Sequence, residues 1–251
     1  MRFSVLASGS KGNVTFLEHE NTRILIDAGM STKYIVEKLV NLNINPNTID
    51  AIFITHGHSD HVKGLKSFVG KYNTKVYITN KMYEEVIPYV DDDNLVYIKQ
   101  SMQFKDFHFR TFRTSHDSAD SVGFIINDEL VYITDTGYLK EELFDEIKNK
   151  KTYIMESNHD VEMVLNCSYP FQTKKRILSD KGHLSNKESS RCLSIVIGNN
   201  TKNVVLIHLS EENNDGAIAL TELSSALVNR NKEVPYVTIS SQNEMTEMIE
   251  V

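Results

Sequence analysis

A cluster of potential metal ligands stands in the stretch FITHGHSDHVKG, residues 53–64. Three of the chain's 9 histidines, His56, His58 and His61, occur here together with Asp60. In an extended segment His56 and His58 project to the same side, and the other two residues follow after a turn, so the cluster could serve two metals. Imidazole and carboxylate suit zinc, manganese or iron. The alternative is a histidine-rich surface turn, and the dense spacing argues against it.

The elements that must position this cluster can be predicted from hydrophobic periodicity. The apolar run AIFIT ends where the cluster begins, so the ligands stand at the end of a buried strand. Strands are predicted at Arg2–Leu6, Val14–Leu17, Arg23–Ile26, Ala51–Thr55, Lys75–Ile78, Phe107–Phe112, Val122–Ile126, Leu130–Thr134, Thr152–Met155 and Val204–His208. Helices are predicted at Thr32–Leu42, Lys81–Ile87, Leu139–Lys148, Phe171–Leu178, Ser185–Ile197 and Ile218–Asn229. Early strands in succession and later strands alternating with helices indicate an α/β protein with mixed sheets.

Composition narrows the class of protein. With 251 residues, four prolines and no Gly/Ser-rich linker, the chain is predicted to form one domain over residues 1–251. A net charge of -7 argues against nucleic-acid binding through a general basic surface, so phosphate binding must be local or mediated by metal. No apolar run approaches the roughly 18 residues of a membrane span. Cys167 and Cys192 show no CxxC spacing, so we expect free thiols and a cytoplasmic protein without membrane contact.

The string HGHSDH resembles the signature of the metallo-β-lactamase superfamily. The resemblance implies that His56, His58, Asp60 and His61 are metal ligands, and that Asp60 is also catalytic. It extends to candidate ligands at other strand ends and to a supporting carboxylate behind the ligand loop, which are His116 in RTSHDS, Asp135 in VYITDTG, His208 in VVLIHLS and Asp27 in ILIDAG. The implied fold is a four-layer αββα sandwich, and the implied cofactors are two divalent ions, manganese or zinc, bridged by Asp135 and a hydroxide.

Two positions and several further strings narrow the reaction that the resemblance implies. Position 135 is Asp where classical β-lactamases have Cys, and position 58 is His where flavodiiron oxidoreductases have Glu. The strings LASGSKGN, ESNHD, GHLSN and HLSEENN resemble the YycJ/WalJ-like nuclease branch. That resemblance implies a phosphodiesterase, specifically a 5′-to-3′ DNA exonuclease, with DNA favoured over RNA. It leaves the oligomeric state open.

His183 is a candidate general acid. The sequence from Ser185 to Glu188 is a capping box, which predicts a helix N-terminus directly after His183, where backbone amides favour anions. An imidazole beside a phosphate could donate a proton to the leaving alkoxide. The alternative is a histidine next to a helix cap with no chemistry. Ser185 itself is predicted to contact substrate.

For several other polar residues the sequence gives weaker evidence of a role in the site. His159 is predicted to support the metal ligands or to face the substrate, although the same segment could simply cap a helix near Asp160. Ser10, Lys11 and Asn13 could bind a terminal phosphate from the first loop. The run Lys174–Arg176 could contact a nucleic-acid backbone, but a solvated helix face is the commoner explanation.

Two alternative functions remain open at this point. A thioester or lactone hydrolase of the glyoxalase II type would direct the same hydroxide at a carbonyl carbon. A regulatory protein without catalysis would keep the fold, but such a protein should have lost ligands, and all seven expected ligand positions are filled.

Overall fold

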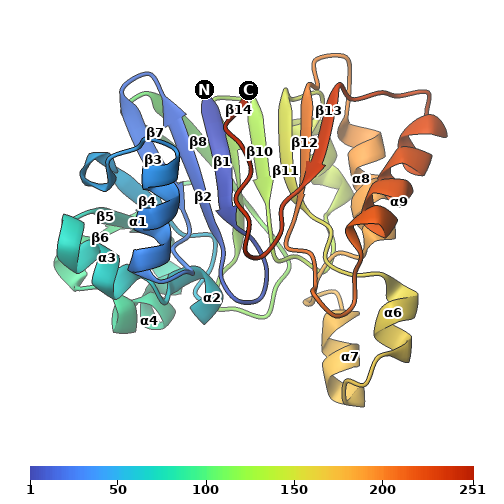
Figure 1. The fold of residues 1–251 in the computed structure, drawn as a ribbon, viewed down its shortest axis with the longest axis horizontal. Helices are drawn as coiled ribbons and strands as arrows, with labels where there is room; N and C mark the ends of the chain where they lie inside the picture. The colour runs from blue at the N-terminus through green and yellow to red at the C-terminus, as the bar shows by residue number, and fades with distance from the viewer. The chain divides into compact units, whose positions relative to one another are not determined.

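The strand-like runs of the sequence form two mixed β-sheets in a computed structural model that describes residues 1–251 (Figure 1). Two units follow from the internal contacts. The first comprises Met1–Thr111, Ser118–Val122 and Ser241–Glu250, and the second comprises Phe112–Asp117, Gly123–Ser240 and Val251.

The first unit holds a seven-stranded sheet in the order β14-β1-β2-β3-β4-β5-β6. Strands β1 to β3 pair antiparallel as successive hairpins, and β3 to β6 pair parallel. The central strands are buried on both faces, which explains their uninterrupted apolar sequences. The strands are β1 (Arg2–Ala7), β2 (Val14–His19), β3 (Thr22–Ile26), β4 (Ala51–Phe53), β5 (Lys75–Ile78), β6 (Leu95–Tyr97) and β14 (Ile249–Glu250). Strands β7 (Ser101–Phe104) and β8 (Phe107–Arg113) form an antiparallel hairpin that belongs to the second seven-stranded sheet.

Four α-helices accompany the first sheet, namely α1 (Thr32–Asn41), α2 (Ser59–Val62), α3 (Leu65–Tyr72) and α4 (Tyr83–Val86). The hydroxyl of Ser31 caps α1 by accepting a hydrogen bond from the Tyr34 amide at 3.3 Å. Ile35 and Leu39, four residues apart, are its fully buried residues. The short helix α2 contains Asp60 and His61, so the predicted ligand cluster lies in the β4–α2 connection.

The second unit contains the strand order β13-β12-β11-β10-β9. Strands β10 to β13 are parallel, and β9 pairs antiparallel with β10. Their bounds are β9 (Val122–Ile126), β10 (Leu130–Ile133), β11 (Thr152–Glu156), β12 (Asn203–Ile207) and β13 (Tyr236–Ile239). The helices are α5 (Phe144–Ile147), α6 (Val161–Asn166), α7 (Phe171–Ile177), α8 (Asn186–Val196) and α9 (Gly216–Val228).

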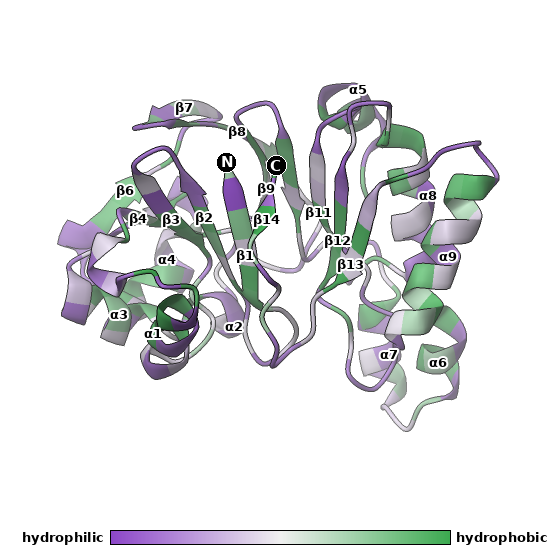
Figure 2. Cartoon of the chain, turned by 45° about the horizontal axis from the view of Figure 1, so that its top comes forward, coloured by the Kyte–Doolittle hydropathy of each residue, from purple (hydrophilic) through white to green (hydrophobic).

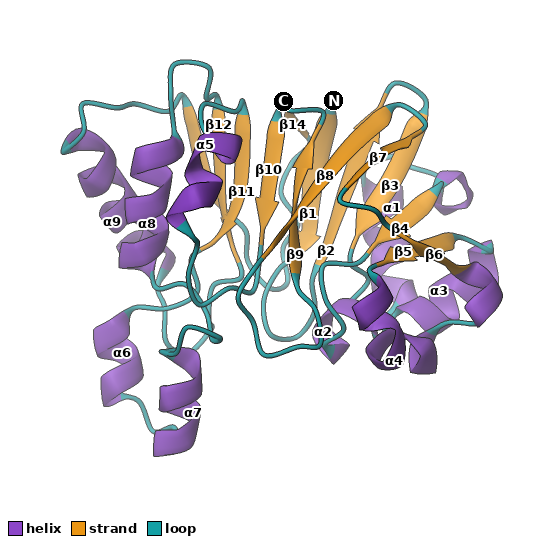
Figure 3. Cartoon of the chain, turned by 180° about the vertical axis from the view of Figure 1, so that it is seen from behind, coloured by secondary structure: helices purple, strands orange, loops and turns teal.

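The core of the second unit lies between its strands and the helices α8 and α9. Tyr153 and Leu206 from the strands pack in one cluster with Leu193 of α8 and Leu223 of α9, all at most 1% exposed. Burying one such leucine contributes about 2 kcal/mol. Figure 2 shows the hydrophobic character of these strands. The pair α6 and α7 forms a small helical hairpin apart from α8 and α9 (Figure 3).

Every strand predicted from the sequence is present, with bounds that agree within two residues. The α/β class with mixed sheets is confirmed. The prediction for Leu139–Lys148 was too long, because Glu141–Leu143 forms a 3₁₀ turn and only Phe144–Ile147 is α-helical. The helix predicted at Lys81–Ile87 was also too long, since 3₁₀ turns flank α4. None of the helices has both the length and the apolar character required to cross a membrane.

Candidate metal centre

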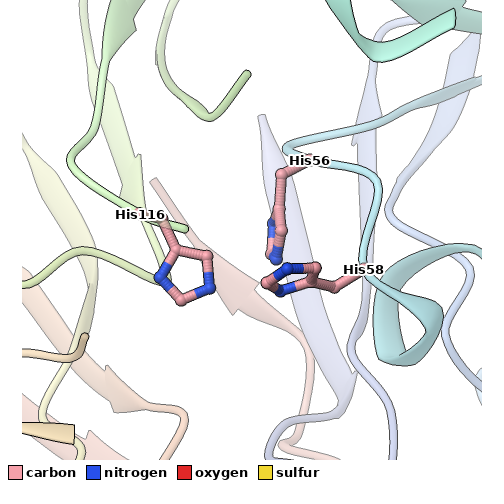
Figure 4. Close-up of side chains that lie close together, drawn as sticks. All are labelled: His56, His58 and His116. Carbon is pink, nitrogen blue, oxygen red and sulfur yellow. The ribbon is translucent and has the colours of Figure 1, made fainter. Parts of the chain in front are cut away.

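The histidine cluster of the first unit begins directly after β4. Its imidazoles are packed together, with ring centroids 4.7 Å apart for His56 and His58 and 4.0 Å apart for His56 and His61. Figure 4 shows His56 and His58 in the loop after β4, and it also shows His116, which follows β8. Both His56 and His61 are fully buried. Buried imidazoles at this density are unusual unless they share a ligand such as a cation.

Asp27 contacts the start of this loop through Thr55 and His61. Its buried carboxylate accepts hydrogen bonds from the amide of Thr55 at 2.8 Å and from the hydroxyl of Thr55 at 2.9 Å. Oδ2 of Asp27 also lies 2.8 Å from Nδ1 of His61. Because a carboxylate only accepts, Nδ1 of His61 is the donor, and the lone pair of the ring is then on Nε2. Burial raises the pKa of Asp27, and the donors from His61 and Thr55 offset part of that shift.

Asn13 contacts two predicted ligands from the first loop. Its Nδ2 lies 3.0 Å from Nε2 of His61 and 3.4 Å from Oδ2 of Asp60. These amide hydrogens therefore face the two atoms that would coordinate a cation. Ser10 and Lys11 of the same loop are exposed, so a ligand outside the protein can reach them, whereas Asn13 is only 2% exposed.

The backbone segments that contain Asn13, Gly29 and Asp60 are in direct contact. The amide of Asn13 donates to the carbonyl of Asp60 at 2.8 Å, and the amide of Gly29 donates to the carbonyl of Asn13 at 2.9 Å. A Cβ atom at position 29 would collide with the backbone of Asp60. Glycine is therefore required where the segment after β3 passes the ligand turn.

In the second unit four acidic and imidazole side chains converge at the ends of neighbouring strands. Asp135 follows β10, Glu156 ends β11 and His208 follows β12, while His183 precedes α8. One ligand atom from each of the four lies within 4.8 Å of all the others. Oδ1 of Asp135 is 3.5 Å from Nδ1 of both histidines. Parallel strands bring these residues together because their carboxyl ends meet at one edge of the sheet.

Glu156 is the site residue that the sequence reasoning missed. Its Oε1 lies 2.8 Å from Nδ1 of His183 and 2.8 Å from Nδ1 of His208. Its Oε2 accepts hydrogen bonds from the amides of Thr136 and Leu184 at 2.9 and 3.2 Å. Burial raises the pKa of Glu156, but His183 and His208 outweigh that effect and lower it to about 2. The signal in the sequence was a glutamate ending the apolar run TYIME, an unusual place for an unpaired charge.

His116 is held by the loop before α8. Its Nδ1 donates to the carbonyl of Gly182 at 3.0 Å, and its Nε2 is 3.7 Å from Oδ1 of Asp135. The neighbouring Asp117 accepts two hydrogen bonds from Arg176, at 2.6 and 2.9 Å. Thus His116 and His183 depend on the same loop, and their ring centroids are 5.1 Å apart.

Three predicted site residues share an uncommon backbone conformation. Asp27, Asp135 and His208 have φ angles of 60°, 49° and 57°. Asp27 and His208 directly follow the buried strands β3 and β12, and Asp135 follows β10 after one further residue. A non-glycine residue in this region costs on the order of 1–3 kcal/mol, and such residues cluster at functional sites. The same backbone conformation therefore occurs at two candidate ligands of the second unit and at the supporting carboxylate of the first.

The remaining predicted residues have clear positions. The hydroxyl of Ser185 caps α8 by accepting a hydrogen bond from the amide of Glu188 at 3.2 Å, which confirms the predicted helix start. His159 is 1% exposed, and its Nδ1 has no hydrogen-bond partner. Burial lowers the pKa of His159 to about 4, so the ring is neutral near pH 7. The predicted site roles of these two residues stay predictions.

The donor set fits divalent cations. In His61, His116 and His208, Nδ1 donates to a carboxylate or carbonyl oxygen at 2.8–3.0 Å, which leaves the lone pair of each ring on Nε2. Imidazole nitrogens and carboxylate oxygens without a thiolate match catalytic zinc, manganese or iron rather than a structural zinc site. Both cysteines are free thiols.

The sequence of this chain is similar to a known domain family and to two exodeoxyribonucleases. A profile of the β-lactamase superfamily domain matches residues 22–209. The chain is 37% identical over 223 residues to exodeoxyribonuclease WalJ of Streptococcus pneumoniae serotype 2, covering 85% of this chain and 83% of that protein. It is 36% identical over 235 residues to exodeoxyribonuclease YycJ of Bacillus anthracis, covering 90% and 89%.

Solved structures agree at the level of the fold. The metallo-β-lactamase fold protein YhfI of Bacillus subtilis superposes with a TM-score of 0.73 at 15% identity, covering 98% of both chains. The short form of human tRNase Z superposes with a TM-score of 0.66 at 16% identity, covering 100% of both. The fold class predicted from the sequence is therefore confirmed.

Proposed function

Because this chain belongs to the metallo-β-lactamase superfamily, we propose that it is a metal-dependent phosphodiesterase that degrades DNA from a 5′ end. The similarity to two exodeoxyribonucleases over most of the chain supports DNA as the substrate. The structural observation that carries the proposal is the fixed tautomer of His61, His116 and His208, whose Nδ1 atoms each donate to an oxygen acceptor. This arrangement prepares Nε2 for a cation.

The proposed ligands are the seven residues predicted from the sequence, namely His56, His58, Asp60, His61, His116, Asp135 and His208. Together they would hold two divalent ions, manganese or zinc. We propose that residues 1–251 form one catalytic domain. When bound, such ions supply a hydroxide nucleophile near neutral pH and positive charge beside the phosphate oxygens. A chain with a net charge of -7 needs that local positive charge to bind a polyanion.

The proposed role of His183 is to protonate the leaving oxygen. Its Nδ1 faces the buried carboxylate of Glu156 at 2.8 Å, so the ring presents Nε2 on its other side. The buried carboxylate of Glu156 fixes the orientation of the ring, and an imidazole in this position can pass a proton to the leaving alkoxide. His183 is partly exposed, with 12% of its side chain accessible, as an acid that meets substrate must be.

We propose that Ser10 and Lys11, which are exposed, bind a terminal phosphate of the substrate, and that Asn13 and Ser185 also contact substrate. Asp60 would act as both ligand and catalytic residue, and Asp27 and His159 would support the ligands. We also propose a cytoplasmic location, since both cysteines are free thiols, as is usual in a reducing compartment.

The direct test uses purified protein loaded in turn with Mn²⁺ or Zn²⁺. Single- and double-stranded DNA and RNA carrying a label at either the 5′ or the 3′ end are digested, and the products are resolved by length. We expect mononucleotide release from the 5′ label, and none from the Asp135→Asn variant. A thioester is assayed in parallel. Faster turnover of the thioester, or no DNA cleavage with either metal, would reject the proposal in favour of an acyl hydrolase or a protein without catalysis.

A further inference from the structure

The helical hairpin α6–α7 carries a surface that neither the core nor the proposed metal ligands explain. Its residues line a hollow of about 790 Å³ in the second unit. We name this surface the α6–α7 patch and define it as Leu165, Tyr169, Phe171, Lys174, Lys175 and Leu178. Phe171 is 75% exposed and Leu165 is 51% exposed. Figure 2 shows that much of α6 is hydrophobic.

This exposure is not a by-product of core packing. Helix α7 has no buried residue, and Val164 is the only buried residue of α6. A phenylalanine on the surface of a helix leaves a large apolar face in water, and contiguous exposed apolar surface usually marks an interaction site. Most side chains of the hairpin are therefore accessible to a partner and do not pack in the core.

The patch is structurally continuous with the loop that carries the candidate acid. His183 follows Leu178 by five residues, and its amide donates to the carbonyl of Ile177 at 3.1 Å. Gly182 in the same loop accepts the hydrogen bond from His116. Arg176 of α7 donates two hydrogen bonds to Asp117, next to His116. Helix α7 is thus fastened at two points to residues beside the proposed ligands.

The charges of the patch select a negatively charged occupant. Lys175 points from the exposed side of α7, and Nζ of Lys174 donates to the carbonyl of Leu165 at 2.7 Å, near the end of α6. Glu212 is an acidic group in contact with the patch: burial raises the pKa of the Tyr169 phenol, and the hydrogen bond from Tyr169 to Glu212 raises it further. In a chain with net charge -7, two adjacent lysines that line the same hollow as the exposed ring of Phe171 form a local exception. Aromatic faces with neighbouring cations are how proteins bind single-stranded nucleic acid.

We propose that the α6–α7 patch binds a single-stranded stretch of the DNA substrate, with a base stacked on Phe171 and a backbone phosphate near Lys175. The inference rests on the proposed function for the identity of the substrate. It adds a binding site outside the metal ligands, which would keep the strand on the protein between successive cleavage steps. A second copy of this chain is the competing occupant, because a purely apolar contact could also cover Phe171.

The experiment measures binding separately from catalysis. Fluorescein-labelled oligothymidylate of twelve nucleotides is titrated with metal-depleted protein at low salt, and anisotropy gives the Kd. The test variant is Phe171→Ala with Lys175→Glu. Matched controls on other surfaces are Tyr236→Ala, an aromatic residue that is 42% exposed, and Lys66→Glu, an exposed lysine of α3. We expect the Kd of the test variant to rise roughly tenfold or more, and the control values to stay within about twofold.

Two further measurements distinguish DNA binding by the patch from catalysis and from dimer formation. Turnover of bis-(p-nitrophenyl) phosphate by the metal-loaded test variant should equal that of the wild type, since this small diester does not reach the patch. Equal oligothymidylate affinity of test variant and wild type would overturn the inference. So would a wild-type dimer in light scattering that the test variant abolishes. If the test variant loses oligothymidylate binding but the wild type does not cleave DNA, the proposed function is rejected and the assignment of the patch stands.

Discussion

Oε1 of Glu156 lies 2.8 Å from Nδ1 of His183, and the same oxygen lies 2.8 Å from Nδ1 of His208. One buried carboxylate oxygen therefore orients both a candidate acid and a candidate metal ligand. Two backbone amides hold the second oxygen, so the carboxylate has little freedom to rotate. The orientation of both imidazoles depends on a residue that contacts neither the solvent nor, in the proposed mechanism, the substrate.

Replacing this carboxylate by an amide should impair catalysis without unfolding the protein. Glu156→Gln keeps the shape of the side chain but substitutes a donor for one acceptor, so one imidazole or the two amides lose their partner. We expect kcat for DNA to fall about 10- to 100-fold, which is typical when a partner of a metal-binding histidine is lost. The matched control is Glu146→Gln on the exposed side of α5. Wild-type kcat in Glu156→Gln would contradict the positioning role.

The acid role of His183 predicts a dependence on the leaving group. In His183→Asn, cleavage of DNA should slow about 100-fold or more, because an alkoxide needs a proton as it leaves. Cleavage of bis-(p-nitrophenyl) phosphate should change little, because its phenolate leaves without one. His108→Asn, on β8, serves as the control histidine. Equal losses on both substrates would instead assign His183 to phosphate binding or structure.

Metal content should follow the predicted ligands. Elemental analysis of protein purified from Mn- or Zn-supplemented medium is expected to give two ions per wild-type chain. Asp60→Ala removes a proposed ligand and should lower that stoichiometry, whereas Asp91→Ala, in an exposed acidic turn, should not. A full complement of metal in Asp60→Ala would remove this residue from the ligand set.

His159 predicts a pH dependence of stability. Its pKa falls from 6.5 to about 4 in the folded protein because burial disfavours the charged ring. The unfolded chain then binds the extra proton between these values, so the contribution to stability is present above pH 6.5 and is lost as the pH falls toward 4. In metal-free protein, the free energy of unfolding measured with urea should fall by about 3 kcal/mol more in wild type than in His159→Gln as the pH is lowered over this range. Parallel pH profiles for the two proteins would contradict a buried neutral imidazole.

Much of the fold could be read from local pattern. The run AIFIT predicts β4 because buried parallel strands have continuous apolar sequences, and the capping box at Ser185 predicts the start of α8. Helix α3 was missed because Gly70 and two lysines weaken an eight-residue pattern. Strands β6, β7, β13 and β14 were missed because they are short or partly exposed, and their pairing depends on neighbouring strands.

The sequence by itself determined the chemistry that this chain can offer, since the imidazoles and carboxylates that follow its apolar runs are groups that can bind a divalent cation. It also identified Asp27 as the support of the ligand loop. Only the tertiary structure decided which ring nitrogen each histidine presents, because that choice depends on acceptors remote in sequence, such as Gly182 for His116. For the same reason Glu156 remained hidden. Its role arises from His183 and His208, 27 and 52 residues away, which meet it only where β11 and β12 end side by side.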